Sequence, residues 1–154
     1  MGMLVKSSAF SEGGPIPKKH SCQGDDVSPD LSWEGVPPGT KSIALIVDDP
    51  DCPGGTWVHW IAYNIPSTLH GLPEAVPAQK TSAGGLRQGE NDFGRIGYGG
   101  PCPPPGKAHR YCFKVYALNS LLELEPGATK ARLESAMKNH ILAEGLLTGR
   151  FQRS

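Results

Sequence analysis

Residues 47–64 read Val-Asp-Asp-Pro-Asp-Cys-Pro-Gly-Gly-Thr-Trp-Val-His-Trp-Ile-Ala-Tyr-Asn, and this stretch decides the fold. The continuous apolar run Ile43–Val47 leads into it and predicts a central strand that is buried on both faces. After a turn rich in proline and glycine, residues 56–65 alternate around aromatic side chains, which predicts a second strand. If that strand is regular, His59 shares a face with Trp57 and Ile61 and points at packed or cavity-lining surface.

The segments around this pair predict a single, mainly β domain over residues 1–154. Four further stretches have the length and pattern of strands: 3–10, 31–33, 109–118 and 143–152. Short strands are also expected near residues 83–88 and 93–96, because a structureless passage of that length is uncommon in a compact domain. Thr129 is a plausible N-cap for the one convincing helix, which is expected to run through about Leu142.

Composition narrows the classes of partner. The 154 residues contain 15 Lys and Arg against 15 Asp and Glu, and the absence of a basic excess argues against nucleic acid and anionic membrane surfaces. The 20 glycines and 15 prolines favour many turns and short strands. No run of eighteen apolar residues occurs, so no integral membrane segment is expected. The start shows no secretory signal pattern, which predicts a cytoplasmic protein.

The polar side chains suited to binding or catalysis belong to the two aromatic strands or lie next to them. The segment 109–118 begins with His109, just as residues 56–65 contain His59. If the two strands are neighbours, one end of the sheet gathers both histidines with the carboxylates of Asp48, Asp49 and Asp51. Arg110 is expected to pair with Asp49 or Asp51, and Asp51 is expected to bond the amides of its own turn.

Two separated motifs carry a family resemblance. The first is Asp49-Pro50-Asp51-x-Pro53, followed by Trp57-Val58-His59-Trp60 and ending in Tyr63-Asn64-Ile65-Pro66. The second is Tyr98-Gly99-Gly100-Pro101-Cys102-Pro103-Pro104, running into His109-Arg110-Tyr111. Together they resemble the signatures of the phosphatidylethanolamine-binding protein family, also called Raf kinase inhibitor-like proteins, in its bacterial and archaeal branch. The resemblance extends from Lys6 to Arg153.

The resemblance implies an antiparallel β-sandwich with one helix near the C terminus. It also implies a small cavity for phosphate, phosphorylated head groups or similar anions, lined at the positions of Asp49, His59, Gly100, Pro101, His109 and Tyr111. Imidazole and phenol groups can donate hydrogen bonds to such an anion. Asp49 would instead hold a histidine N–H, because a carboxylate repels an anion.

The expected function is therefore that of a non-enzymatic binding protein, without catalytic residues, metal or cofactor. The family also implies regulation of a kinase or protease by binding, and dimers in the prokaryotic branch. The alternative is a metal-dependent enzyme that uses two histidines and one carboxylate.

The four cysteines, Cys22, Cys52, Cys102 and Cys112, lack Cys-x-x-Cys spacing, which removes the main support for zinc-ribbon and thioredoxin-like folds. Cys52 and Cys102 stand in the two cavity motifs. They could form a pair that senses oxidation, although two reduced thiols are the more common arrangement in a cytoplasmic protein.

Overall fold

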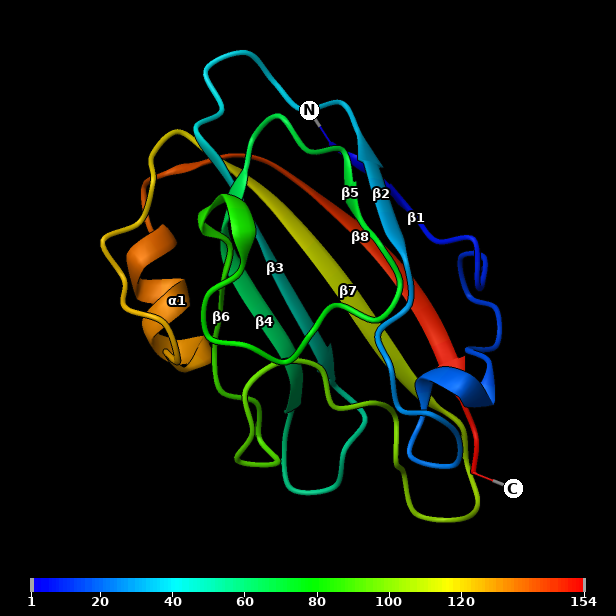
Figure 1. Cartoon of the computed structure of the whole chain (residues 1–154). Coiled ribbons are helices and arrows are strands. Elements are labelled where there is room, and N and C mark those ends of the chain that lie inside the picture. Colours follow the sequence, from blue (N-terminus) through cyan, green and yellow to red (C-terminus); the bar gives the residue numbers. More distant parts are fainter. Residues whose placement is uncertain (1, 154) are drawn as a thin grey trace.

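The computed structural model describes residues 2–153 and arranges their strands in two antiparallel sheets (Figure 1). The larger sheet has the order β6-β4-β3-β7-β8. Its strands are Arg87–Gln88, Trp57–Pro66, Ser42–Asp49, His109–Leu118 and Ile141–Phe151. The smaller sheet has the order β1-β2-β5, with strands Leu4–Lys6, Leu31–Glu34 and Gly71–Leu72. The predicted mainly β fold is confirmed.

Strand β3 is the centre of the molecule. All eight of its residues are buried, and it pairs with β4 on one side and β7 on the other. A strand in that position has no edge or face in contact with water, which explains its unbroken apolar run. The prediction of a central strand is confirmed, and β7 begins and ends at the predicted residues.

Two apolar clusters lie on opposite faces of the larger sheet. One fills the space between the sheets and includes Trp33, Leu45 and Phe113. The other lies between the larger sheet and the helix α1, Lys130–Met137, and includes Ile46 and Leu133. The helix and the smaller sheet therefore cover opposite faces of the larger sheet (Figure 1).

The predicted start of the helix is confirmed, and its predicted end is wrong. The Thr129 hydroxyl accepts a hydrogen bond from the Arg132 amide at 3.3 Å, as an N-cap does. The helix ends at Met137 because Lys138 leaves helical backbone geometry and Asn139 has a left-handed φ of 69°. The chain then enters β8 at Ile141 instead of continuing as helix.

The passage between β5 and β7 is less regular than predicted. It contains the short 3₁₀ helix Ala83–Gly85 and the two-residue strand β6. Residues 93–96 form no named strand; a single bridge joins Glu90 to Ile96. A second 3₁₀ helix, Lys18–His20, precedes β2.

A β-bulge at His59 changes the side-chain pattern of β4. Val47 pairs with Trp60 while Asp48 pairs with Val58, so His59 is an extra residue that faces no partner on β3. Because of this extra residue, Ile61 packs in the helix-side cluster together with Val58. The predicted regular alternation, with Ile61 on the face of His59, is therefore wrong.

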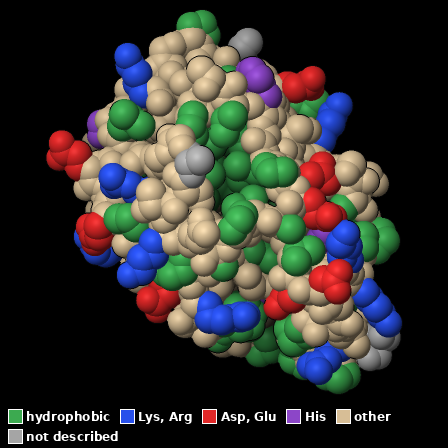
Figure 2. All heavy atoms as spheres, viewed as in Figure 1, with side chains coloured by type: hydrophobic (Ala, Val, Ile, Leu, Met, Phe, Trp, Pro, Cys, Tyr) green, Lys and Arg blue, Asp and Glu red, His purple; other side chains and the backbone are tan. Residues whose placement is uncertain are grey.

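The visible surface carries mixed charge. In Figure 2, Lys and Arg side chains are interspersed with Asp and Glu, and neither sign forms a large continuous area on that face. This agrees with the balanced composition of 15 cationic and 15 acidic residues. Within residues 2–153, no helix has the length and apolar character needed to cross a membrane.

Candidate functional site

A cavity of about 200 Å³ opens where β3 ends and β4 and β7 begin. Its walls come from the two motif segments and from the loop that precedes the second motif. The lining residues are Asp49, Cys52, Trp57, His59, Phe93, Cys102, Pro103, Pro104, His109 and Tyr111. The structure thus brings four of the six sequence-predicted site residues into one cavity, across sixty positions of the chain.

His109 is fixed by a carboxylate. Its Nδ1 lies 2.7 Å from Oδ2 of Asp49, and both side chains are buried. The other Asp49 oxygen, Oδ1, accepts the Asp51 amide at 2.7 Å. Because an ionised carboxylate only accepts, Nδ1 of His109 carries the proton and Nε2 is left as the second ring nitrogen. This is the orienting arrangement expected for Asp49.

His59 is fixed by the backbone of the second motif. Its Nδ1 lies 2.7 Å from the Gly99 carbonyl oxygen, which can only accept, so Nδ1–H donates to it. Burial lowers the pKa of His59 below its ordinary 6.5. The hydrogen bond to the Gly99 carbonyl acts in the opposite direction and is the smaller effect. The ring is therefore neutral near pH 7, with Nε2 available to accept or, once protonated, to donate.

Tyr111 has a buried hydroxyl that no group of residues 2–153 satisfies. The side chain is 1% exposed, belongs to the core between the sheets and also lines the cavity. Burial, followed by the charge of Asp49, raises its pKa well above 10, so the phenol stays protonated and is a donor. Such an unsatisfied buried group is uncommon in native proteins and points to a missing partner.

Arg110 and Asp51 join the two motifs at the rim. The guanidinium makes two hydrogen bonds to the carboxylate, Nε–Oδ2 at 3.0 Å and Nη2–Oδ1 at 2.8 Å, and the Arg110 amide adds a third at 2.9 Å. These bonds lower the pKa of Asp51 to about 2. Of the two predicted partners for Arg110, the structure selects Asp51, which bonds the neighbouring strand instead of the amides of its own turn.

Phe93 is a wall residue that sequence reasoning missed. Its ring makes edge contacts with Trp57 and His59, with centroids 5.6 Å and 5.4 Å apart. Asn91 holds the turn by accepting the amides of Phe93 and Arg95 at Oδ1. The signal available in the sequence is this turn-forming Asn, whereas the prediction for residues 93–96 is a short strand.

The two remaining predicted site residues, Gly100 and Pro101, lie beside the cavity and do not line it. The Gly100 amide donates to Oδ1 of Asp26 at 2.8 Å, and the Pro101 carbonyl oxygen accepts the Cys22 amide at 3.1 Å. They attach the second motif to the segment 20–26. A direct contact of either residue with a ligand stays a prediction.

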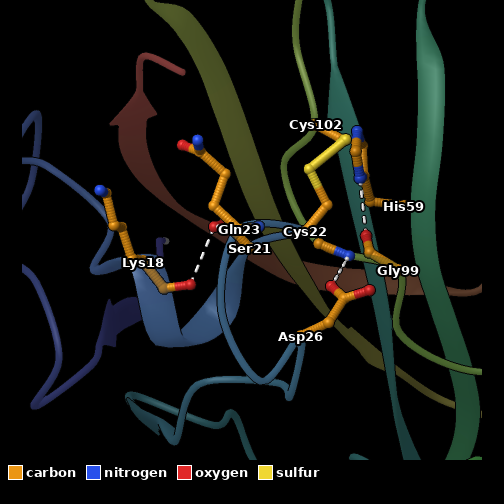
Figure 3. The surroundings of a disulfide bond; sticks show 9 residues. Lys18, Ser21, Cys22, Gln23, Asp26, His59, Gly99 and Cys102 are labelled. Carbon is orange, nitrogen blue, oxygen red and sulfur yellow. Dashed lines mark hydrogen bonds between the residues drawn. A yellow bond between two sulfur atoms is a disulfide. The ribbon is translucent and has the colours of Figure 1, made fainter. Parts of the chain in front are cut away.

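Cys102 forms a disulfide bond with Cys22 (Figure 3), with Cα atoms 5.4 Å apart. Cys52 and Cys112 are free. Both predicted arrangements, a Cys52–Cys102 pair and two reduced thiols, are therefore wrong for Cys102. The two cysteines are 80 positions apart, and the hydrogen bond from the Cys22 amide to the Pro101 carbonyl oxygen holds their segments together, a proximity that cysteine spacing does not encode.

No cluster of three or more His, Cys, Asp or Glu side chains suited to a metal ion occurs among the described residues. The two histidines of the cavity each use Nδ1 for a protein contact, and both oxygens of Asp49 are engaged.

Fold and cavity together define a β-sandwich protein with a small, imidazole-lined cavity at one end of its larger sheet. The sequence model described as phosphatidylethanolamine-binding protein matches residues 6–152. The chain belongs to the phosphatidylethanolamine-binding protein family.

Relatives and solved structures agree with this membership. A UPF0098 protein of Methanothermobacter thermautotrophicus is 49% identical over 151 residues, covering 98% of this chain and 99% of the relative. The crystal structure of a phosphatidylethanolamine-binding protein homologue from Chlamydia trachomatis has a TM-score of 0.90 at 44% identity and covers 99% of both chains. Escherichia coli YbcL, described as a member of the mammalian family, has a TM-score of 0.90 at 35% identity and covers 100% of both chains.

Proposed function

We propose that the cavity binds a small anion, namely phosphate or a phosphorylated head group, and that the protein acts by binding and not by catalysis. The observation that carries this proposal is the hydroxyl of Tyr111, a cavity-lining residue: the hydroxyl is buried, protonated and without a hydrogen-bond partner among the described residues. A donor held in that state is prepared for an acceptor, and a hydrogen bond to an anion is stronger than one to a neutral group.

The two imidazoles supply further hydrogen-bonding groups. His59 and His109 each commit Nδ1 to the protein, which leaves Nε2 of each ring for a ligand. The carboxylate of Asp49 is engaged by the protein, because its two oxygens accept hydrogen bonds from His109 and from the Asp51 amide. The Asp49 carboxylate holds the His109 ring by its Nδ1–H, which fixes the orientation of the second ring nitrogen, Nε2.

The size and walls of the cavity favour a small ligand. At about 200 Å³ it is smaller than the roughly 300–1,000 Å³ of pockets for drug-sized molecules. Its walls are mainly aromatic and proline side chains, so the few polar groups are concentrated where they can orient one charged group. The proposal includes a phosphorylated group on a partner protein, such as a kinase or protease, as one source of that anion.

The metal-dependent enzyme receives less support. A two-histidine, one-carboxylate site requires carboxylate oxygens directed at the metal, and both Asp49 oxygens are engaged with protein donors. Self-association to a homodimer and a cytoplasmic location stay predictions from the sequence.

Calorimetric titration of inorganic phosphate into protein dialysed against EDTA tests the proposal. Saturable binding of one anion per chain is expected, and binding should be lost in His109→Ala. Binding that requires added divalent metal, with stoichiometric metal retained by wild type and lost in both His59→Ala and His109→Ala, would instead support the enzyme.

A further inference from the structure

The wall of the cavity is attached to a distant segment through one covalent bond. Residues 98–102 lie against residues 20–26, and the disulfide Cys22–Cys102 closes this contact. Three hydrogen bonds accompany it: Tyr98 Oη to the His20 carbonyl oxygen at 2.7 Å, the Gly100 amide to Asp26 Oδ1 at 2.8 Å, and the Cys22 amide to the Pro101 carbonyl oxygen at 3.1 Å.

The contact between the two segments is close. A methyl group placed on Gly100 would lie 2.2 Å from the His20 carbonyl oxygen and 2.4 Å from Asp26 Oδ1, which is closer than real side-chain contacts. The second motif therefore takes its position from segment 20–26. The position of Cys102 in the cavity wall then depends on the same contact.

The same stretch sets the orientation of His59. The Gly99 carbonyl accepts the Nδ1 proton of His59 at 2.7 Å, and the Gly99 amide donates to the His59 carbonyl at 2.9 Å. Figure 3 shows the disulfide together with the hydrogen bond from His59 to the Gly99 carbonyl and the hydrogen bond at the Asp26 carboxylate. The disulfide at Cys102 is thus linked, through residues 99–101, to the ring of His59 that lines the cavity.

The disulfide is accessible to a reductant. Both Cys22 and Cys102 are exposed, and thiol–disulfide exchange requires that an incoming thiolate reach one of the two sulfur atoms. The three hydrogen bonds named above also join the segments, and a hydrogen bond opens far more readily than a covalent bond.

From this arrangement we infer that the Cys22–Cys102 disulfide is a redox site that controls the anion affinity of the cavity. This inference rests on the proposed anion binding. In the oxidised protein the wall is assembled and His59 is held ready for the ligand. In the reduced protein segment 98–102 is released, and binding must then order it again at a cost in affinity.

The chemical step is thiol–disulfide exchange with a dithiol reductant. One thiolate of the reductant attacks a sulfur atom of the disulfide, forms a mixed disulfide and displaces the other cysteine as a thiolate, which takes up a proton. The second thiol of the reductant then resolves the mixed disulfide. Two electrons and two protons pass to the protein, which gains two thiols, and the reductant becomes a disulfide.

Calorimetric titration of inorganic phosphate into oxidised and dithiothreitol-reduced protein, each desalted without oxygen, tests the inference. Mass after alkylation should show two free thiols in the oxidised protein and four in the reduced protein. Reduction is expected to weaken phosphate binding at least threefold. Cys22→Ser should bind weakly with or without reductant, and Cys112→Ser, altered outside the cavity, should respond as wild type does.

Hydrogen exchange gives a second readout that needs no ligand. The amides of Gly99 and Gly100 should exchange faster after reduction, while amides in the centre of β3 should not. Equal phosphate affinity of the two redox forms, or four free thiols in untreated protein, would overturn the redox inference and leave anion binding intact. Failure of the oxidised protein to bind phosphate would refute the proposed function itself, and with it the inference.

Discussion

Replacing Tyr111 by phenylalanine tests whether the Tyr111 hydroxyl donates to a ligand or stabilises the fold. The substitution removes one oxygen atom from a side chain that is 1% exposed, and that oxygen has no partner in the described chain. Leaving a buried hydroxyl unpaired costs about 1–3 kcal/mol, so Tyr111→Phe should be as stable as wild type or more stable, by up to about 1 kcal/mol.

Phosphate affinity should change in the opposite direction. A hydrogen bond to a charged group contributes about 1.5–3 kcal/mol, which corresponds to binding that is about 10- to 150-fold weaker in Tyr111→Phe. Calorimetric titration measures the affinity, and urea unfolding without phosphate measures the stability. Tyr116→Phe is the matched control, because Tyr116 lies on the same strand and packs against the helix-side cluster. Unchanged phosphate affinity, or a loss of stability that accompanies the loss of binding, would refute the reasoning.

Three further predictions concern neighbouring groups. Asp49→Asn should weaken phosphate binding about tenfold, because an amide holds the Nδ1–H of His109 less firmly than a carboxylate does and the ring loses its fixed orientation. Asp48→Asn is the control, because the Asp48 carboxylate pairs with lysines outside the cavity, and it should leave the affinity unchanged in the same titration. Burial lowers the pKa of His59 below 6.5, so the stability that neutral His59 contributes is present above pH 6.5 and is lost as the pH falls toward the folded-state pKa. Urea unfolding from pH 8 to 5 should therefore show a free energy of unfolding that falls with pH in wild type and falls less in His59→Gln. Gly100→Ala should lower the free energy of unfolding by about 1–3 kcal/mol through its clash with the His20 carbonyl, and unchanged stability would contradict the close contact of the two segments.

The sequence was informative where local pattern and tertiary environment agree. The unbroken apolar run of Ile43–Val47 predicted a doubly buried strand, and β3 is that strand. The aromatic alternation after His109 predicted β7, and both of its ends were correct. Thr129 marked the start of the helix because an N-cap is a local hydrogen bond.

The misses involve features that local pattern does not encode. The helical spacing of apolar residues continues past Met137, but from Ile141 onward the chain pairs with β7 as strand β8. The bulge at His59 adds one residue to β4, and the choice of position depends on the register with β3. The bond between Cys22 and Cys102 depends on the fold bringing two loops together.

The candidate site was predictable where its residues stand in sequence motifs and not where they lack one. Asp49, His59, His109 and Tyr111 stand in recognisable motifs and converge in the cavity. Phe93 carries no such motif, and its place in the wall follows from the turn held by Asn91.

The crystal structure of the oxidised protein in saturating phosphate, prepared after chelator treatment, tests the central claim most directly. The account predicts one phosphate in the cavity, with an oxygen within hydrogen-bond distance of Tyr111 Oη and another near Nε2 of His59 or His109. A cavity that holds only water under those conditions, or a phosphate bound through a metal ion, would contradict it.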